Sequence, residues 1–109
     1  DPATDALEVE EDDDVNVTLT VQTGEPVEGA KFHVVLPKGL AFSPDDYPDM
    51  EGKQVLTILD DMPDGTKDLD FTVRGVQAGK WEVTAIVEAG DDVLVSGTTI
   101  LVAPREERL

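Results

Sequence analysis

The sequence predicts an all-β fold, a small antiparallel β-sandwich, from three observations. Seven stretches either alternate apolar and polar residues or are rich in β-branched residues, and each ends in a turn of Gly, Pro or Asp. None of these stretches shows the 3.6-residue period of an amphipathic helix. Hydrophobic residues make up 39% of the 109 residues but aromatic residues only 5%, so Val, Leu and Ile must fill the core.

The first part of the chain predicts three strands and their connections. Residues 7–11 can form a short strand, and the aspartates at 12–14 form a turn. Residues 15–21 (VNVTLTV) alternate strictly, which is typical of a strand with one face in the core and one in water. A turn-rich connection at 23–29 then leads to residues 30–36, which alternate in the same way.

The middle of the chain is richer in turns. A Pro-Lys-Gly bend precedes Leu40 and Phe42, which return to the core. Residues 43–52 form a loop rich in Pro and Asp, and residues 54–59 form a strand whose phase is ambiguous. We expect residues 60–66 (DDMPDGT) to form a second turn, because Asp-Gly pairs favour the positive φ angles of tight turns.

The last part of the chain predicts three long strands. Residues 68–74 alternate, and the next strand, at 81–88, places Trp81 in phase with its inward-facing valines. A Gly-Asp-Asp turn of the hairpin type follows at 90–92. Residues 93–102 form the final strand, which carries apolar residues on both faces and is less guarded than the acidic first strand. Such a strand is either central in its sheet or covered by the next domain of the parent protein.

Seven strands at this spacing, with no helix between them, are typical of an immunoglobulin-like sandwich. The chain has no Cys, which excludes a disulfide framework, a thiolate metal site and a Cys nucleophile. We expect the sandwich to span residues 7–104, with a flexible segment at 1–6 and a charged tail or linker at 105–109. The predicted core residues point inward from their strands: Val17, Leu19, Phe32, Val34, Leu36, Phe71, Val73, Trp81, Val83 and Ala85.

The net charge of the chain limits the classes of partner that it can bind. The formal net charge is −17, from 25 acidic and 8 basic residues. Such a surface repels phosphate groups, which disfavours nucleic acids and anionic membranes as partners. No apolar run approaches the roughly 18 residues of a membrane span, so we expect no membrane insertion by this segment. An acidic surface poor in Lys fits a halophile or a salt-rich exterior, or simply a soluble surface that resists aggregation.

Three segments occur in a characteristic order: LPKGL at 36–40, ILDDMPDGTKDLDFTV at 58–73 and AGKWEVTAIVEAGDD at 78–92. Their order and spacing resemble the immunoglobulin-like conserved-repeat modules of bacterial and archaeal surface proteins, and the similar cell-adhesion-related domain. The resemblance covers roughly residues 8–103 and implies a spacer or display module without shared catalytic residues. Two features depart from the repeats: Asp60 stands where they often have Gly, and the connection at 23–29 replaces their usual Asn-Gly segment.

The residues give little support to an enzyme. His33 is the only histidine, so a His-based metal cluster is excluded, and a Ser–His–Asp triad would have to use it. It lies on the polar side of its strand beside Lys31, and the chain has no G-x-S-x-G elbow. With 25 carboxylates in 109 residues, neighbouring pairs arise by chance. We therefore expect a solvated histidine, no enzymatic activity and no cofactor.

Calcium is an alternative, because Ca²⁺ prefers several oxygen ligands from flexible loops. The candidate ligands lie in predicted turns: Asp45, Asp46, Asp49, Asp60, Asp61 and Asp64. The EF-hand spacing is absent, and Asp is also a common turn residue. A calcium site here would require aspartates from two different loops.

Carbohydrate binding requires an exposed aromatic platform. Tyr47, in a predicted loop, is the candidate, whereas Trp81 is expected in the core.

The main hypothesis from these observations is a non-enzymatic structural or spacer module of a larger bacterial or archaeal cell-surface or secreted protein. Its partners would be the neighbouring domains of the same polypeptide, and we expect a monomer. The alternative is a module that binds a glycan or a protein in adhesion, with calcium as a stabilising ion.

Overall fold

The computed structural model describes residues 7–105 and contains eight strands. The predicted flexible segment at 1–6 and the last four residues of the predicted tail lie outside the described residues. The elements are β1 (Leu7–Glu10), β2 (Asp14–Thr23), β3 (Val27–Val35), β4 (Leu40–Phe42), the single-turn 3-10 helix η2 (Pro48–Met50), β5 (Val55–Met62), β6 (Gly65–Gly75), β7 (Gly79–Ala89) and β8 (Asp92–Ala103). The fold is all-β, as predicted.

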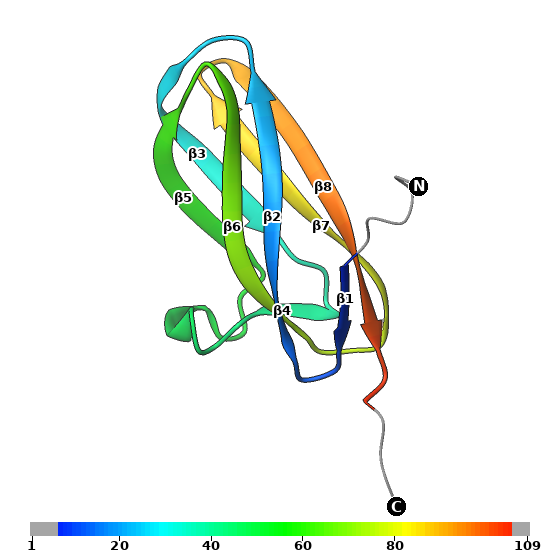
Figure 1. Ribbon diagram of the computed structural model, residues 1–109. Helices are drawn as coiled ribbons and strands as arrows, with labels where there is room; N and C mark the ends of the chain where they lie inside the picture. The colour runs from blue at the N-terminus through cyan, green and yellow to red at the C-terminus, as the bar shows by residue number, and fades with distance from the viewer. Residues whose placement is uncertain (1–6, 106–109) are drawn as a thin grey trace, which may run out of the picture.

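The strands form two sheets. The five-stranded sheet has the order β1-β8-β7-β3-β5, and the three-stranded sheet has the order β2-β6-β4. Figure 1 shows the two sheets as separate layers with their long strands running in the same general direction. The long pairs β7–β8, β2–β6, β3–β5 and β3–β7 are all antiparallel.

The prediction of seven antiparallel strands is corrected in two respects. Leu40–Phe42, which was expected only to return to the core, forms a separate strand on the edge of the three-stranded sheet. The first strand pairs with the last in parallel, with Leu7 opposite Ile100 and Glu10 opposite Ala103, so the larger sheet is mixed. No hairpin joins these two strands, so no turn imposes an antiparallel direction on them.

The predicted turn at 60–66 is also corrected. Asp60 and Asp61 continue β5, and Met62 at its end is 1% exposed and pairs with Val27. Only two residues separate β5 from β6, which belongs to the other sheet. The turn residues in this segment suggested a loop, but burial of Met62 between the sheets extends the strand.

The core is mostly aliphatic, with three phenylalanines, and lies between the two sheets. Nine of the ten predicted core residues are at most 3% exposed: Val17, Leu19, Phe32, Val34, Leu36, Phe71, Val73, Val83 and Ala85. Trp81 differs from the prediction, because its side chain is only partly buried. It has the inward phase of β7 and faces Ile100 on β8, but it lies near the end of the sandwich.

The two ends of the described chain lie in the same half of the molecule. β1 and the end of β8 are paired, and Figure 1 shows both in the lower half with β4. The β2–β3, β5–β6 and β7–β8 connections meet at the opposite end of the sandwich. That end is therefore remote from both points where the chain enters and leaves the fold.

Candidate functional site

The outer face of the three-stranded sheet is polar. Thr18 and Thr20 on β2 lie opposite Asp70 and Asp68 on β6. Each threonine hydroxyl donates a hydrogen bond to the facing carboxylate, at 2.6 Å for Thr18 and 2.8 Å for Thr20. Cross-strand pairs of this kind stabilise a sheet while leaving it hydrated.

The outer face of the five-stranded sheet is much more apolar. Val93 and Val95 on β8 are 64% and 67% exposed, and Leu59 on β5 is 68% exposed. At the middle of this face, His33 Nε2 lies 2.7 Å from a carboxylate oxygen of Glu88, and its Nδ1 lies 2.9 Å from the Thr57 hydroxyl. The histidine therefore lies on the outward face, as predicted, but it is not the solvated residue that was expected, because its side chain is only 21% exposed and both ring nitrogens contact neighbouring strands.

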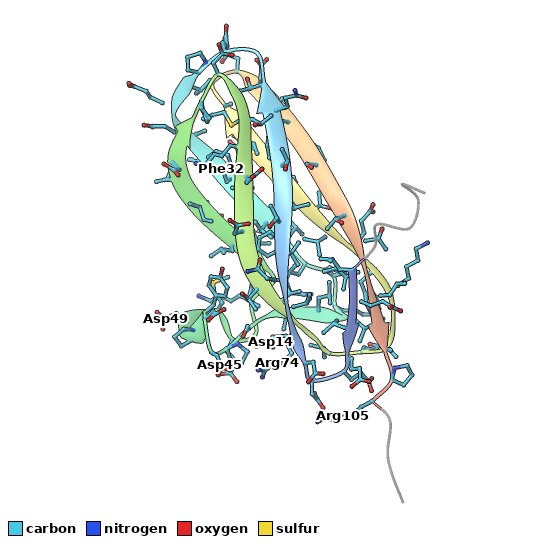
Figure 2. All side chains as sticks on the ribbon, viewed as in Figure 1. Asp14, Phe32, Asp45, Asp49, Arg74 and Arg105 are labelled. Carbon is cyan, nitrogen blue, oxygen red and sulfur yellow. The ribbon has the colours of Figure 1, made fainter. Side chains whose placement is uncertain are left out.

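A polar cluster at the lower end of the sandwich joins three segments (Figure 2). Asp14, at the start of β2, accepts a hydrogen bond from Arg74 Nε on β6 at 2.8 Å. Its second oxygen accepts one at 2.6 Å from the hydroxyl of Ser43, which is fully buried just after β4. Arg74 Nη2 also lies 3.8 Å from an Asp45 carboxylate oxygen.

Charge pairing within this cluster shifts the ionisation of both partners. The hydrogen bond from Arg74 holds the pKa of Asp14 below its ordinary value, with a smaller contribution from Ser43, and outweighs the opposing effect of burial. The same contact raises the pKa of Arg74. The charged hydrogen bonds of this cluster therefore link β2, β6 and the segment after β4.

The predicted calcium ligands do not come together. Asp45, Asp46 and Asp49 lie in the β4–β5 loop around η2, and Figure 2 shows Asp45 and Asp49 at the lower left. Asp60 and Asp61 lie on β5, and Asp64 follows in the β5–β6 connection at the other end of the sandwich. Within residues 7–105, no group of three or more acidic or histidine side chains is arranged to hold a metal ion.

Each aspartate on β5 has a partner within the fold. Asp60 accepts a hydrogen bond from Lys67 Nζ at 2.9 Å, which lowers the pKa of the carboxyl group. Asp61 accepts a hydrogen bond from the backbone N–H of Gly29 at 3.0 Å. The Asp61 carboxylate therefore contacts the bulged start of β3, where the register with β5 shifts between Val27 and Ala30, whereas the Asp60 carboxylate links β5 to β6.

Tyr47, the candidate for carbohydrate binding, and Trp81, the expected core residue, both make contacts within the fold. Tyr47 is partly buried and packs edge-to-face on Phe42, with the ring centroids 5.8 Å apart. Trp81 donates a hydrogen bond from its indole N–H to the carbonyl of Gln77 at 2.7 Å. Tyr47 therefore contributes to the packing of the β4–β5 loop on the core, and this loop lies away from the remote end of the sandwich in Figure 1.

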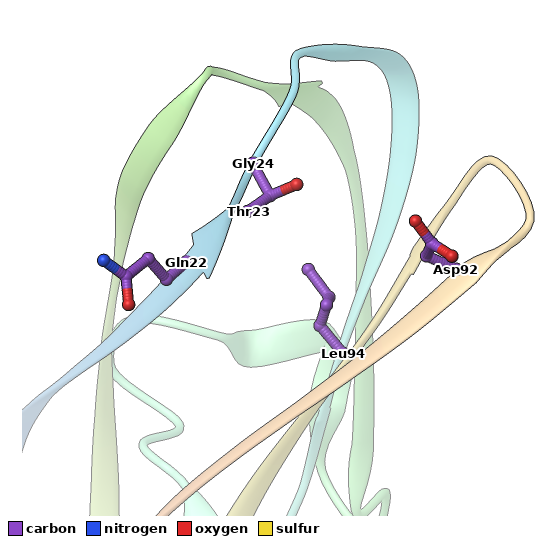
Figure 3. Close-up of a pocket in the computed structure, with 5 residues that line it drawn as sticks. All are labelled: Gln22, Thr23, Gly24, Asp92 and Leu94. Atoms are coloured by element: carbon purple, nitrogen blue, oxygen red, sulfur yellow. The ribbon is translucent and has the colours of Figure 1, made fainter.

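That remote end has a shallow depression of about 460 Å³ (Figure 3). It is lined by Gln22, Thr23 and Gly24 at the end of β2 and by Asp92 and Leu94 at the start of β8. Thr23, Asp92 and Leu94 offer a hydroxyl, a carboxylate and one apolar surface, whereas the amide of Gln22 points away from them in Figure 3. Sequence analysis missed this set, because the two segments are about 70 residues apart and only the packing of the two sheets brings them together.

A second group of contacts that the sequence did not reveal connects the two ends of the described chain. The Glu11 carboxylate accepts hydrogen bonds from the backbone N–H of Ala78 at 3.2 Å and of Arg105 at 3.3 Å. The Glu11 backbone N–H donates to the Ala103 carbonyl at 3.0 Å, and Arg105 Nη1 lies 3.6 Å from an Asp12 oxygen. These contacts extend the β1–β8 pairing beyond the end of both strands.

No protein-family model matches the chain, and no curated protein matches it either. Among residues 7–105, no helix is long and apolar enough to cross a membrane. The candidate sites are therefore defined by their geometry alone: the depression between β2 and β8, the outer face and edge of the five-stranded sheet, and the fastening of β1 to β8.

Proposed function

We propose that the chain is a non-enzymatic, immunoglobulin-like module of a bacterial or archaeal cell-surface or secreted protein, which spaces or presents its neighbouring domains. Two lines support the proposal. The ordered segments LPKGL, ILDDMPDGTKDLDFTV and AGKWEVTAIVEAGDD resemble repeats with that role. The two-sheet, all-β architecture with a core of mostly aliphatic side chains supplies a rigid body of the kind that such a role requires.

The observation that carries the proposal is the parallel pairing of β1 with β8. A spacer transmits tension from the residues before Leu7 to the residues after Arg105. Because the two strands run in the same direction, opposite pulls on these ends slide the strands along each other. All hydrogen bonds of the pair then resist together, whereas a pull across an antiparallel hairpin would break them one at a time.

The experiment is single-molecule unfolding under force with a proline substitution in β1. The Glu11 N–H bonds to Ala103, so the alternation of a parallel ladder points the Val9 N–H toward β8 and the Glu8 N–H away from it. We expect Val9→Pro to lower the unfolding force clearly, because proline removes a ladder hydrogen bond. Glu8→Pro is the matched control and should leave the force close to that of the unchanged chain.

A second control separates mechanical from equilibrium stability. Leu69 on β6 is 5% exposed and lies away from β1 and β8 in the other sheet. Leu69→Ala should lower the free energy of unfolding by about 2–4 kcal/mol. It should nevertheless reduce the unfolding force less than Val9→Pro does. Equal forces for Val9→Pro and the unchanged chain would contradict a tension-bearing role for β1.

A second candidate function is binding of a glycan or a protein in adhesion, and the depression between β2 and β8 favours it. It lies at the end remote from both chain ends, where a ligand would not collide with neighbouring domains. Binding on a glycan array that is lost with Thr23→Ala or Asp92→Ala, but kept with Tyr47→Ala, would support this candidate. Loss with Tyr47→Ala alone would instead place the ligand at the β4–β5 loop.

A further inference from the structure

β5 is a long, exposed edge of the five-stranded sheet. The order of the sheet leaves one side of β5 without a partner strand among the described residues. Six of its eight residues are exposed, including Val55 at 49%, Ile58 at 37% and Leu59 at 68%. Natural sheets guard such edges with Pro, Lys or inward-pointing charge, and residues 55–59 (VLTIL) carry none of these.

The other sheet edges are better protected. β1, at the opposite edge of the same sheet, is only four residues long and carries two glutamates. β4 is three residues long. β2, the ten-residue edge of the three-stranded sheet, lies against the upper part of β8, the strand that the sequence suggested as poorly guarded. The Thr20 carbonyl of β2 accepts a hydrogen bond from the Ser96 hydroxyl of β8 at 3.2 Å. β5 is therefore the edge most open to another strand.

We propose that β5 is an association surface for a second copy of this chain, paired antiparallel about Thr57. In this register Thr57 faces its own counterpart, and Val55 of each copy faces Leu59 of the other. Leu56 likewise faces Ile58, so the apolar segment matches itself without a gap. The pairing joins the two five-stranded sheets into one continuous sheet.

The charges flanking β5 favour this register and direction. Lys53, two residues before the strand, comes opposite Asp61 of the second copy, so each end of the pair brings unlike charges together. A parallel arrangement in register would instead place Asp60 and Asp61 beside their own counterparts, and like charges facing each other destabilise a strand pair. The matching of Lys53 with Asp61 is the reason to assign the edge to a second copy and not to an unrelated peptide.

The same segment of β5 also has backbone donors and acceptors that are free to bond a second strand. The Gln54 carbonyl accepts from the Leu36 N–H at 2.8 Å, so the alternation of an antiparallel ladder turns the N–H and C=O groups of Val55, Thr57 and Leu59 toward the free side. The Asp61 N–H is already bonded to the Asp60 carboxylate at 2.8 Å. The open part of the edge therefore ends just beyond Leu59, as this register requires.

Engineered cysteines test the register, because the chain has no Cys of its own. Thr57→Cys should form a disulfide-linked dimer under mild oxidation, since facing residues lie within the reach of a disulfide. Leu59→Cys alone should link at least about tenfold more slowly, because its counterpart lies roughly 13 Å away along the strand. A mixture of Leu59→Cys and Val55→Cys chains should link as readily as Thr57→Cys.

Sedimentation of the full chain tests the association without cross-linking. The pairing should be weak, so we expect a monomer–dimer equilibrium at about 1 mM chain, as is usual for small interfaces. Leu59→Lys should weaken dimerisation at least about tenfold, because each copy places a charge against Val55 of the other. Val95→Lys is the control, as Val95 is equally exposed at 67% on the same sheet but on β8.

Three results would overturn the proposal. One is a chain that stays monomeric at that concentration. Another is a Val95→Lys effect equal to or larger than that of Leu59→Lys, which would place the interface on the sheet face. The third is cross-linking of Leu59→Cys to itself as fast as Thr57→Cys, which would mean that the strands pair in another register.

Discussion

At the scale of single residues, Trp81 and Gly39 explain why two sequence segments occur together. The indole of Trp81 lies directly over Gly39, and a Cβ atom added to Gly39 would lie 1.9 Å from Cε2 of the ring. The glycine of the Leu-Pro-x-Gly-Leu segment therefore packs directly against the ring of the tryptophan in the Gly-x-Trp segment. This bend covers one side of the ring, and the indole N–H donates a hydrogen bond to the Gln77 carbonyl. The ring is nevertheless only partly buried.

Gly39→Ala should therefore displace the indole ring. Because the methyl group meets the ring and not open space, we expect a loss of about 1–3 kcal/mol in the free energy of unfolding. Trp81 is the only tryptophan, so its fluorescence should report the displacement directly. Gly24→Ala is the matched control, since nothing lies within 4 Å of its added methyl group. Unchanged fluorescence and stability in Gly39→Ala would contradict this packing.

Asp14 makes a pH-dependent contribution to stability. Its pKa in the folded state is lowered from 3.8 by Arg74, so the contribution is fully present above that value and is lost as the pH falls through the folded-state pKa. Asp14→Asn should cost about 1–2 kcal/mol near neutral pH. Denaturant titrations should show this difference shrinking below about pH 4.

Asp13→Asn is the control for this titration. Asp13 is exposed, and the hydrogen bonds that the structure gives it involve only its backbone, which donates to Glu10 and accepts from Gly75. The difference in free energy between this variant and the unchanged chain should stay within about 0.5 kcal/mol. A cost of Asp14→Asn that is constant at every pH would mean that packing, and not charge, holds the cluster together.

At the scale of elements, the alternation of side chains predicted most of the strands and their inward faces. It worked where apolar and polar residues alternate without interruption, as in β2 and β7. It failed at β5, because Asp60, Asp61 and the following Pro-Asp-Gly are typical of a turn and the strand lies at an edge with most residues exposed. The signal that could have extended the strand was Met62, a large apolar residue among turn residues.

Met62 should therefore be a determinant of stability. It is 1% exposed, so Met62→Ala should lower the free energy of unfolding by about 2–4 kcal/mol through lost contacts and a residual cavity. Leu59→Ala on the same strand should change it by less than about 0.5 kcal/mol, since Leu59 is 68% exposed. Chemical denaturation measures both, and similar costs for the two variants would mean that Met62 is not enclosed between the sheets.

At the scale of the whole molecule, the dominant property is the net charge of −17 on a domain of 109 residues. Repulsion among the carboxylates opposes the compact state, and salt weakens it by screening. The described structure offers local compensation, because Arg74 pairs with Asp14 and Lys67 with Asp60. Eight basic residues cannot neutralise 25 acidic ones, so much of the repulsion remains.

We therefore expect the melting temperature to rise with salt, by about 5 °C or more between low and molar NaCl, which corresponds to roughly 1 kcal/mol. CaCl₂ at equal ionic strength should give a similar rise, because the candidate aspartates lie at opposite ends of the sandwich. A jump at low-millimolar CaCl₂ alone would indicate a specific site. Asp45→Asn and Asp64→Asn would then show which end of the sandwich holds the ion.

The all-β class and the inward face of nearly every strand could be predicted from local patterns of residues alone. These properties follow from the period of two in a β-strand, which is local and can be read from neighbouring residues. The composition also shows the acidic surface and the absence of cysteine chemistry.

Features that depend on contacts between distant segments became visible only in the folded molecule. Examples are the parallel pairing of β1 with β8, the exposure of the β5 edge, the fastening of Asp14 by Arg74 and Ser43, and the separation of the two groups of aspartates. Strand order and direction are set by how two sheets enclose a common core, and no single segment contains that information. Trp81 illustrates both the local and the long-range contribution. Its phase in the strand places it inward, whereas its position near the end of the sandwich leaves the ring half-buried.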